Sequence, residues 1–221
     1  VLVCGYEKLF HEDQKRSLLA FDGAVDTEDP EGMSGALKRL AAAAGETVDA
    51  ETDDKSRSVF VDIYGYMTKA HMKNYGTTRE QIAGVTAKNS RHGALNPRAQ
   101  FQKVVTVEDV LAAREIVWPL TLPMCSPIGD GAAAVILVSE RKAKAMGLAK
   151  KVRVMSSALV SGFEPDDQHH SVGAFAVAQA YESAGIGPKD INFAEVHDAS
   201  ATSEIIAYEY LQLCERGGGG K

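Results

Sequence analysis

The sequence has 221 residues, of which 45% are hydrophobic and 24% are charged, so it can bury a core and is not a disordered chain. Its net charge of −6 argues against a nucleic-acid surface, and no apolar run approaches the length of a membrane span. The three cysteines, Cys4, Cys125 and Cys214, are too widely spaced for a disulfide framework or a zinc site, which favours a reducing, cytoplasmic environment.

Residues 1–5 form an apolar run that is typical of a buried strand with no lead-in, and the chain closes on a glycine run at 217–220 that reads as a loop leading nowhere. A buried parallel strand needs neighbours on both sides. We therefore expect further sequence at both ends of the chain.

The segment from about residue 11 to 117 is expected to be a mainly helical insertion, which begins with a charged surface stretch at 11–16. A capping box at 77–80 opens one helix, and Gly93 with Asn96-Pro97 predicts a loop at 91–97. Residues 118–123 should be extended, because residues that precede proline avoid the helical region. The helices expected in this segment, in chain order, lie at 34–44, 60–74, 78–90 and 106–113.

From residue 132 onward, predicted strands and helices alternate, which favours an α/β fold with a largely parallel sheet. Residues 1–5 and 132–138 are both continuously apolar, so we expect them to pair in one sheet on either side of the insertion. The remaining elements expected here are strands at 152–159 and 193–196 and helices at 139–147 and 172–184.

The stretch 193–204 places His197 and Asp198 where a predicted strand stops and a helix follows. Open α/β sheets bind ligands at this point, and a histidine can donate a hydrogen bond or act as a general acid or base near neutral pH. The alternative is a histidine that only stabilises the turn between strand and helix. The pattern alone leaves both interpretations open.

Short motifs recur in a fixed order along the chain, at Tyr75-Gly76-Thr77, Lys88-Asn89-Ser90, Asn96-Pro97, Gln100-Phe101, Cys125-Ser126-Pro127, Asp130-Gly131-Ala132, His197-Asp198, Tyr208-Glu209 and Leu213-Cys214. Together they resemble the thiolase superfamily, and within it the sterol-carrier-protein-x type with its lipid-transfer-protein-like acetyl-CoA acetyltransferases. The resemblance covers nearly the whole chain.

The resemblance implies part of a thiolase fold, in which two similar α/β halves form a five-layered α-β-α-β-α body. Residues 1–10 and 123–150 would belong to the N-terminal half. Residues 11–122 would form the mainly helical loop domain that is inserted in this half and shapes the acyl-CoA pocket. Residues 151–221 would begin the C-terminal half.

The implied function is acyl transfer to or from coenzyme A, by thiolysis or condensation of 3-oxoacyl-CoA in lipid or sterol metabolism. Coenzyme A would be a substrate, and no covalently bound cofactor is implied. The alternative is a non-thiolytic relative, either a lipid or acyl-CoA-binding protein or a steroid side-chain retro-aldolase that works with a small zinc-ribbon or OB-fold partner. Thiolases are dimers or tetramers, so a homodimer or homotetramer is expected.

His197 matches the His-Asp motif of the family, whose histidine helps to form an oxyanion hole, and Asp198 would orient the turn. Ser200 departs from the bulky phenylalanine of the family. The nucleophilic cysteine of the family lies upstream of the motif matched by Val1, so the resemblance implies no nucleophile in this chain and no turnover by the chain alone. A cysteine at that upstream position would favour a thiolase, and another residue the non-thiolytic alternative.

Weaker candidates are His92, which could approach the phosphates of coenzyme A, and His71 and Met72, which could line the acyl pocket. For His92 the alternative is an exposed loop histidine without a role.

Cys125 has no histidine nearby in sequence and is more typical of a small buried residue than of a nucleophile. His169-His170 lacks a visible third ligand, so no metal site is predicted.

Overall fold

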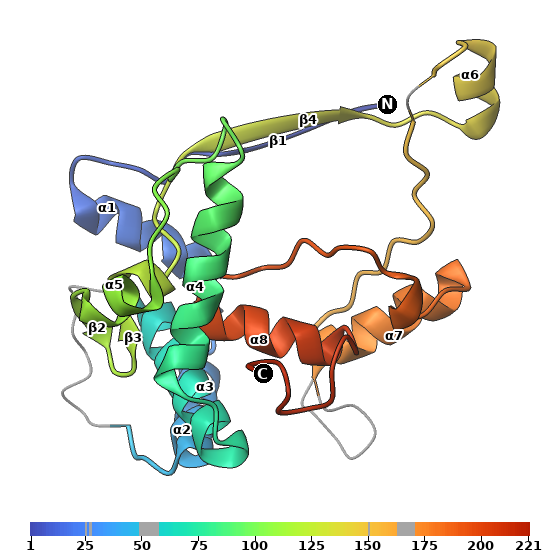
Figure 1. The fold of residues 1–221 in the computed structure, drawn as a ribbon. Coiled ribbons are helices and arrows are strands. Elements are labelled where there is room, and N and C mark those ends of the chain that lie inside the picture. Colours follow the sequence, from blue (N-terminus) through green and yellow to red (C-terminus); the bar gives the residue numbers. More distant parts are fainter. Residues whose placement is uncertain (25, 27, 49–57, 150, 163–170) are drawn as a thin grey trace.

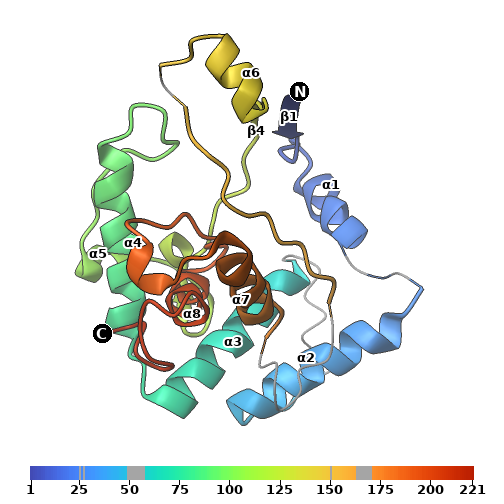
Figure 2. The ribbon, with the colours of Figure 1, turned by 90° about the vertical axis from the view of Figure 1, so that its right-hand side faces the viewer.

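The structure is a computed structural model that describes residues 1–24, 26, 28–48, 58–149, 151–162 and 171–221. Helices dominate these residues, and two small antiparallel sheets accompany them (Figure 1). The ribbon of β1 and β4 extends along one side of the helical body, and α6 lies apart from that body near the far end of the ribbon (Figures 1 and 2).

The first sheet joins the two apolar segments on either side of the insertion. Strand β1 (Leu2–Glu7) pairs with β4 (Gly131–Ile136), from Leu2 opposite Ile136 to Glu7 opposite Gly131. This confirms that the two segments lie side by side. The expectation of a largely parallel sheet is wrong for the described residues, because the pairing is antiparallel. Both strands are exposed along their whole length, so their apolar character does not reflect burial within this structure.

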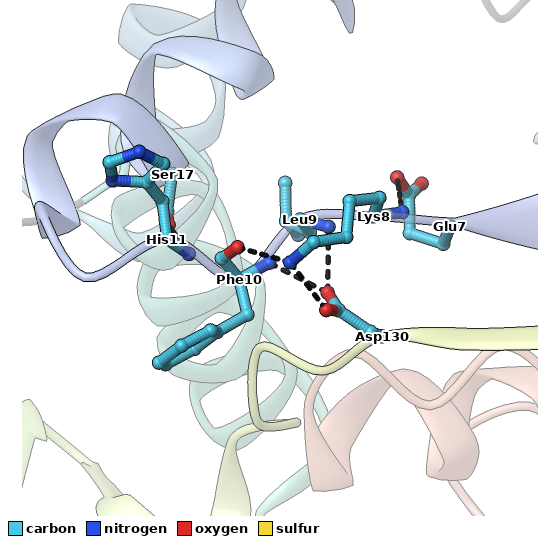
Figure 3. A network of polar contacts seen from close by, with 7 residues as sticks. All are labelled: Glu7, Lys8, Leu9, Phe10, His11, Ser17 and Asp130. Carbon is cyan, nitrogen blue, oxygen red and sulfur yellow. Dashed lines mark hydrogen bonds and ion pairs between the residues drawn. The ribbon is translucent and has the colours of Figure 1, made fainter.

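Asp130 fixes the point where the chain leaves β1 and returns to β4 (Figure 3). One carboxylate oxygen accepts the backbone N–H groups of Leu9 at 2.9 Å and Phe10 at 2.8 Å. The other accepts Nζ of Lys8 at 2.6 Å. The bond from Lys8, with those from the backbone, lowers the pKa of Asp130. Asp130 therefore holds together the two ends of the segment that lies between β1 and β4.

Most insertion helices lie where the sequence predicts them, and left-handed glycines at 45 and 76 end two of them as expected. The prediction of a surface segment at 11–16 is incomplete, because a short helix begins there. These helices are α1 (Gln14–Leu19), α2 (Pro30–Ala44), α3 (Val59–Tyr75), α4 (Arg79–Ala94) and α5 (Val107–Ala112), and a 3-10 turn at Ala20–Ala24 follows α1.

The prediction that α4 ends near Ser90 is wrong, since the helix continues to Ala94. Gly93 lies inside this last turn, where a Cβ atom would stand 2.9 Å from the carbonyl oxygen of Phe101. Its absent side chain thus allows a close approach of the chain, and a helical glycine costs only about 1 kcal/mol. The capping box that starts α4 is present, with Thr78 and Gln81 as its two members.

After α5 the chain forms a hairpin and then joins the core. Strand β2 (Glu115–Val117) pairs with β3 (Leu120–Thr121), where extended structure was predicted, and a 3-10 turn follows at Leu122–Met124. The buried core is contributed by α4, α5, this hairpin with its turn, and α8; it consists of Ile82, Ala83, Val85, Val110, Leu120, Met124, Ala201 and Ile205.

The C-terminal part consists of helices joined by extended chain. The helices are α6 (Glu140–Ala145), α7 (Val172–Ala184) and α8 (Ala201–Tyr210), and a 3-10 turn at Pro188–Asp190 lies between α7 and α8. The predicted strands at 152–159 and 193–196 are wrong, because neither segment pairs with another among the described residues. Their apolar side chains are solvent-exposed, with Leu159 at 98% and Phe193 at 83%. An apolar run becomes a strand only where a neighbour supplies hydrogen bonds.

The glycine run at 217–220 consists of turns, in agreement with its interpretation as a loop, and it packs against the body. A Cβ atom on Gly217 would lie 2.4 Å from the ring of Tyr75, and one on Gly219 would lie 2.4 Å from the carbonyl oxygen of Ile205. Glycine is therefore required by close contact with α3 and α8.

Candidate functional site

The His197-Asp198 segment is extended and leads into α8. Its end is tied to a neighbouring loop, because the backbone N–H of Ser126 donates to the carbonyl of Ala199 at 3.1 Å and Cys125 forms an isolated β-bridge with Ser200. Ser200 also caps α8 by accepting the N–H of Ser203. His197 and Asp198 are both exposed. The prediction that His197 ends a strand is therefore wrong, whereas the helix after it is confirmed.

The side chain of Asp198 lies next to α4. The amide nitrogen of Asn89 donates to one oxygen of Asp198 at 3.4 Å and to an oxygen of Glu204 at 2.5 Å. A single amide thus joins the exposed carboxylate that follows His197 to a carboxylate in the interior of the α4–α8 contact.

Glu204 is the centre of a buried polar network between α4 and α8, with only 5% of its side chain exposed. Besides Asn89, it accepts hydrogen bonds from Nζ of Lys88 and from the hydroxyl of Tyr208, which also accepts from Lys88 at 2.8 Å. Lys88, Asn89 and Tyr208 all donate to this carboxylate, which is what a buried charge requires.

The protonation states follow from the same contacts. Burial by itself raises the pKa of Glu204, but the hydrogen bonds from Lys88, Tyr208 and Asn89 outweigh it and hold the pKa below the usual glutamate value. Burial likewise opposes the charged form of Lys88, yet the bonds to Glu204 and Tyr208 raise its pKa above the usual lysine value. The pair is thus ionised at neutral pH.

Sequence reasoning missed this network. It noted the Lys88-Asn89-Ser90 motif only as part of a family resemblance and gave Glu204 no role. The available signal was the position of Glu204 in the first turn of a helix, between Thr202 and Ile205. Both of these neighbours are buried in the structure. Its cationic partner lies 116 residues away, which no local pattern shows.

His71 and Met72 lie on α3, where the side chain of His71 contacts Glu209 of α8. One ring nitrogen of His71 contacts Oγ1 of Thr77 at 2.8 Å, and the other contacts Oε1 of Glu209 at 3.0 Å. Only 5% of this side chain is exposed. Met72 packs against the core. Among the described residues, neither of these side chains forms a hydrogen bond with His197.

His92 is exposed on the last turn of α4, so its predicted place in a loop is wrong, while its predicted role is unaffected. His169 and His170 lie outside the described residues. Across the part of the chain that the structure describes, no group of three histidine, cysteine, aspartate or glutamate residues could hold a metal ion. In that same part, no helix combines the length and the apolar character needed to cross a membrane.

The cysteines lie in three separate places. Cys4 is exposed on β1, and Cys125 and Cys214 are half-buried. Burial raises the pKa of the Cys125 thiol, and burial together with the nearby Glu209 and Glu215 raises that of Cys214. A raised pKa reduces the thiolate fraction, so neither of these two sites resembles that of an activated nucleophile.

Comparison with known proteins shows what this chain is similar to. Residues 163–221 match the family described as thiolase C-terminal domain-like. The chain is 38% identical over 166 residues to the BbsB subunit of benzoylsuccinyl-CoA thiolase from Thauera aromatica, covering 73% of this chain and 43% of that protein. The chain is a relative of the thiolases.

Two further proteins are similar to comparable parts of this chain. Human sterol carrier protein 2 is 38% identical over 71% of this chain and 30% of its own length. The acetyl-CoA acetyltransferase of Methanothermobacter thermautotrophicus is 39% identical over 78% of this chain and 46% of its own length. The chain thus spans less than half of the length of these thiolase relatives.

A solved structure supports the same fold. The structure titled "Ltp2-ChsH2(DUF35) aldolase" superposes with a TM-score of 0.61 at 26% identity, over 72% of this chain and 44% of that one. The chain therefore has part of an α/β thiolase fold.

Proposed function

We propose that these residues serve an acyl-CoA-handling protein of the thiolase type, which transfers acyl groups to or from coenzyme A by thiolysis or condensation of 3-oxoacyl-CoA. The observation that carries the proposal is the similarity to relatives named as a CoA thiolase and an acetyl-CoA acetyltransferase, over about three quarters of the chain. The substrates would belong to lipid or sterol metabolism, in keeping with the similarity to sterol carrier protein 2.

In this proposal His197 donates a hydrogen bond to the thioester oxygen as negative charge develops on it. Its side chain is exposed at the end of an anchored segment, where a substrate can reach it. His92 contacts the phosphates of coenzyme A, which is a substrate and not a resident cofactor. His71 and Met72 shape the acyl pocket from within α3.

No cysteine of this chain is proposed as the nucleophile, and the chain by itself is proposed to be inactive. The raised thiol pKa values of Cys125 and Cys214 support this proposal, because a covalent acyl step needs a thiolate.

The test is His197→Ala in the natural polypeptide that contains these residues, assayed by loss of 3-oxoacyl-CoA absorbance in the presence of coenzyme A. Losing one oxyanion-hole donor should lower kcat by about a hundred- to a thousandfold with the far-UV spectrum unchanged. His11→Ala, at an exposed histidine of the insertion, is the matched control.

Absence of turnover in the unaltered polypeptide would contradict the thiolase proposal. Unchanged kinetics in His197→Ala would instead leave the histidine with a turn-stabilising role. Residues 1–221 alone should show no thiolysis, and turnover that disappears when Cys125 is alkylated would identify that thiol as the nucleophile.

A second candidate is a retro-aldolase that cleaves a steroid side-chain thioester together with a partner protein, and the similarity to a solved aldolase favours it. A carbonyl product released from such a thioester only when a small zinc-ribbon or OB-fold partner is added would select this activity over thiolysis. A homodimer or homotetramer in the cytoplasm is proposed for either activity, and analytical ultracentrifugation tests the assembly.

A further inference from the structure

The extended segment before α8 has few anchors. Among the described residues, its hydrogen bonds are made by the carbonyl of Ala199, by the backbone bridge at Ser200 and by the side chain of Asp198. His197 has no hydrogen-bond partner in the described part of the chain and is exposed. The direction in which His197 points is therefore set by how its two neighbours downstream are held.

The anchor at Asp198 is the amide of Asn89, and the geometry fixes that amide. An asparagine amide nitrogen carries two hydrogens, and here both face carboxylate oxygens, one of Asp198 and one of Glu204. The opposite amide orientation would point a carbonyl oxygen at two carboxylates, which is repulsive. The orientation of Asn89 thus follows from its two acceptors.

Glu204 is in turn immobilised from the other side. Lys88 and Tyr208 both donate to it, and the side chain is almost wholly buried. A continuous series of hydrogen bonds therefore runs from the buried ion pair, through Asn89, to the exposed Asp198.

We propose that Asn89 is a positioning residue, which transmits the rigidity of the buried Lys88–Glu204 pair to the exposed segment that carries His197. The inference rests on the proposed role of His197, because positioning a side chain matters only if that side chain acts. Asn89 itself contacts no substrate in this proposal. Its function is to hold Asp198 against α4 so that the neighbouring histidine is presented in one direction.

The primary experiment is backbone nitrogen-15 relaxation of the 221-residue chain by NMR, which gives order parameters for residues 195–199 and, separately, for α8. Asn89→Ala should lower the order parameters at 195–199 from about 0.85 toward about 0.6 while those of α8 stay unchanged. The matched control is Ser90→Ala, which removes hydrogen bonds to Ala87 and Val105 from the next position of α4 without touching Asp198. It should leave the order parameters at 195–199 unchanged.

A second variant guards against misfolding of Asn89→Ala. Asp198→Ala removes the exposed end of the same contact, and it should lower the order parameters at 195–199 to the same extent. The double variant should lower them no further, because both changes break the same hydrogen bond. Unchanged order parameters in Asp198→Ala, or additive effects in the double variant, would overturn the proposal.

Kinetics in the natural polypeptide give the functional readout. Asn89→Ala should lower kcat by about tenfold and leave KM within about twofold, whereas Ser90→Ala should change neither. If the unaltered polypeptide lacks turnover, the proposed function fails while the relaxation experiment still decides the positioning. If turnover is present and Asn89→Ala matches the unaltered protein, the positioning role fails while the function stands.

Discussion

Replacing Lys88 by methionine tests the buried network most directly. The change removes the ammonium group that pairs with Glu204 and keeps an unbranched side chain on α4. Removing one partner of a fully buried ion pair costs about 3–5 kcal/mol, because the other charge is left in a medium of low dielectric constant. Lys88 is 34% exposed, and Asn89 and Tyr208 still donate to the carboxylate, so we expect a smaller loss of about 2 kcal/mol.

The measurement is urea unfolding followed by far-UV circular dichroism at pH 7, supported by a thermal scan. For a chain of this size a loss of about 2 kcal/mol corresponds to a fall in Tm of about 4–8 °C. Lys144→Met is the matched control, because it removes a lysine–glutamate pair whose side chains are more than 60% exposed. Its cost should stay below about 0.5 kcal/mol.

The dependence of the folding stability on pH is an independent test of the same ion pair. The folded-state pKa of Glu204 is depressed, so its stabilisation is present above the unfolded-state pKa and is lost as pH falls through the folded value. Once the pH has fallen through this depressed pKa, the carboxylate is neutral in the unaltered protein too, and the difference in stability between Lys88→Met and the unaltered chain should narrow.

Two results would refute this reasoning about the pair. One is an equal cost for Lys88→Met and Lys144→Met. The other is a double variant, Lys88→Met with Glu204→Gln, that is no more stable than Lys88→Met alone, because neutralising the stranded carboxylate should recover part of the loss.

Two further predictions concern the packing of the chain. Gly219→Ala should destabilise the fold by about 1–3 kcal/mol in urea unfolding, because its Cβ atom would lie 2.4 Å from the carbonyl oxygen of Ile205. The control Gly84→Ala, in open space within α4, should instead stabilise the fold by up to about 1 kcal/mol. The opposite order of stabilities would show that the glycine run is not closely packed. Asp130→Ala should speed amide exchange at Leu9 without lowering the midpoint of unfolding by urea. Lowering the pH through the depressed pKa of Asp130 should also speed this exchange in the unaltered chain. If the Leu9 amide stays protected after both changes, Asp130 does not hold the junction together.

Local signals in the sequence located the helices well. The left-handed glycines at 45 and 76 and the capping serine at 139 act on the backbone groups of their own helix ends, so they can be recognised without knowledge of the rest of the chain. The pairing of β1 with β4 could also be predicted, because two continuously apolar segments flank one insertion.

Only the tertiary structure decided the direction of that pairing and which other apolar runs become strands. Residues 152–159 and 193–196 have strand-like composition, but strand formation depends on a neighbour that supplies backbone hydrogen bonds. Helix α4 likewise continues past Gly93, where the chain at Phe101 approaches closely, and a local rule for glycine cannot include that contact.

The candidate site shows the same division. The sequence by itself determined that a His197-Asp198 pair precedes a helix and that its motif is of thiolase type. The tertiary structure alone decided that Glu204 is buried and that Lys88 and Asn89, on a helix more than a hundred residues earlier, supply its donors. Burial and pairing of charges are properties of the space between two helices, and that space exists only once the chain has folded.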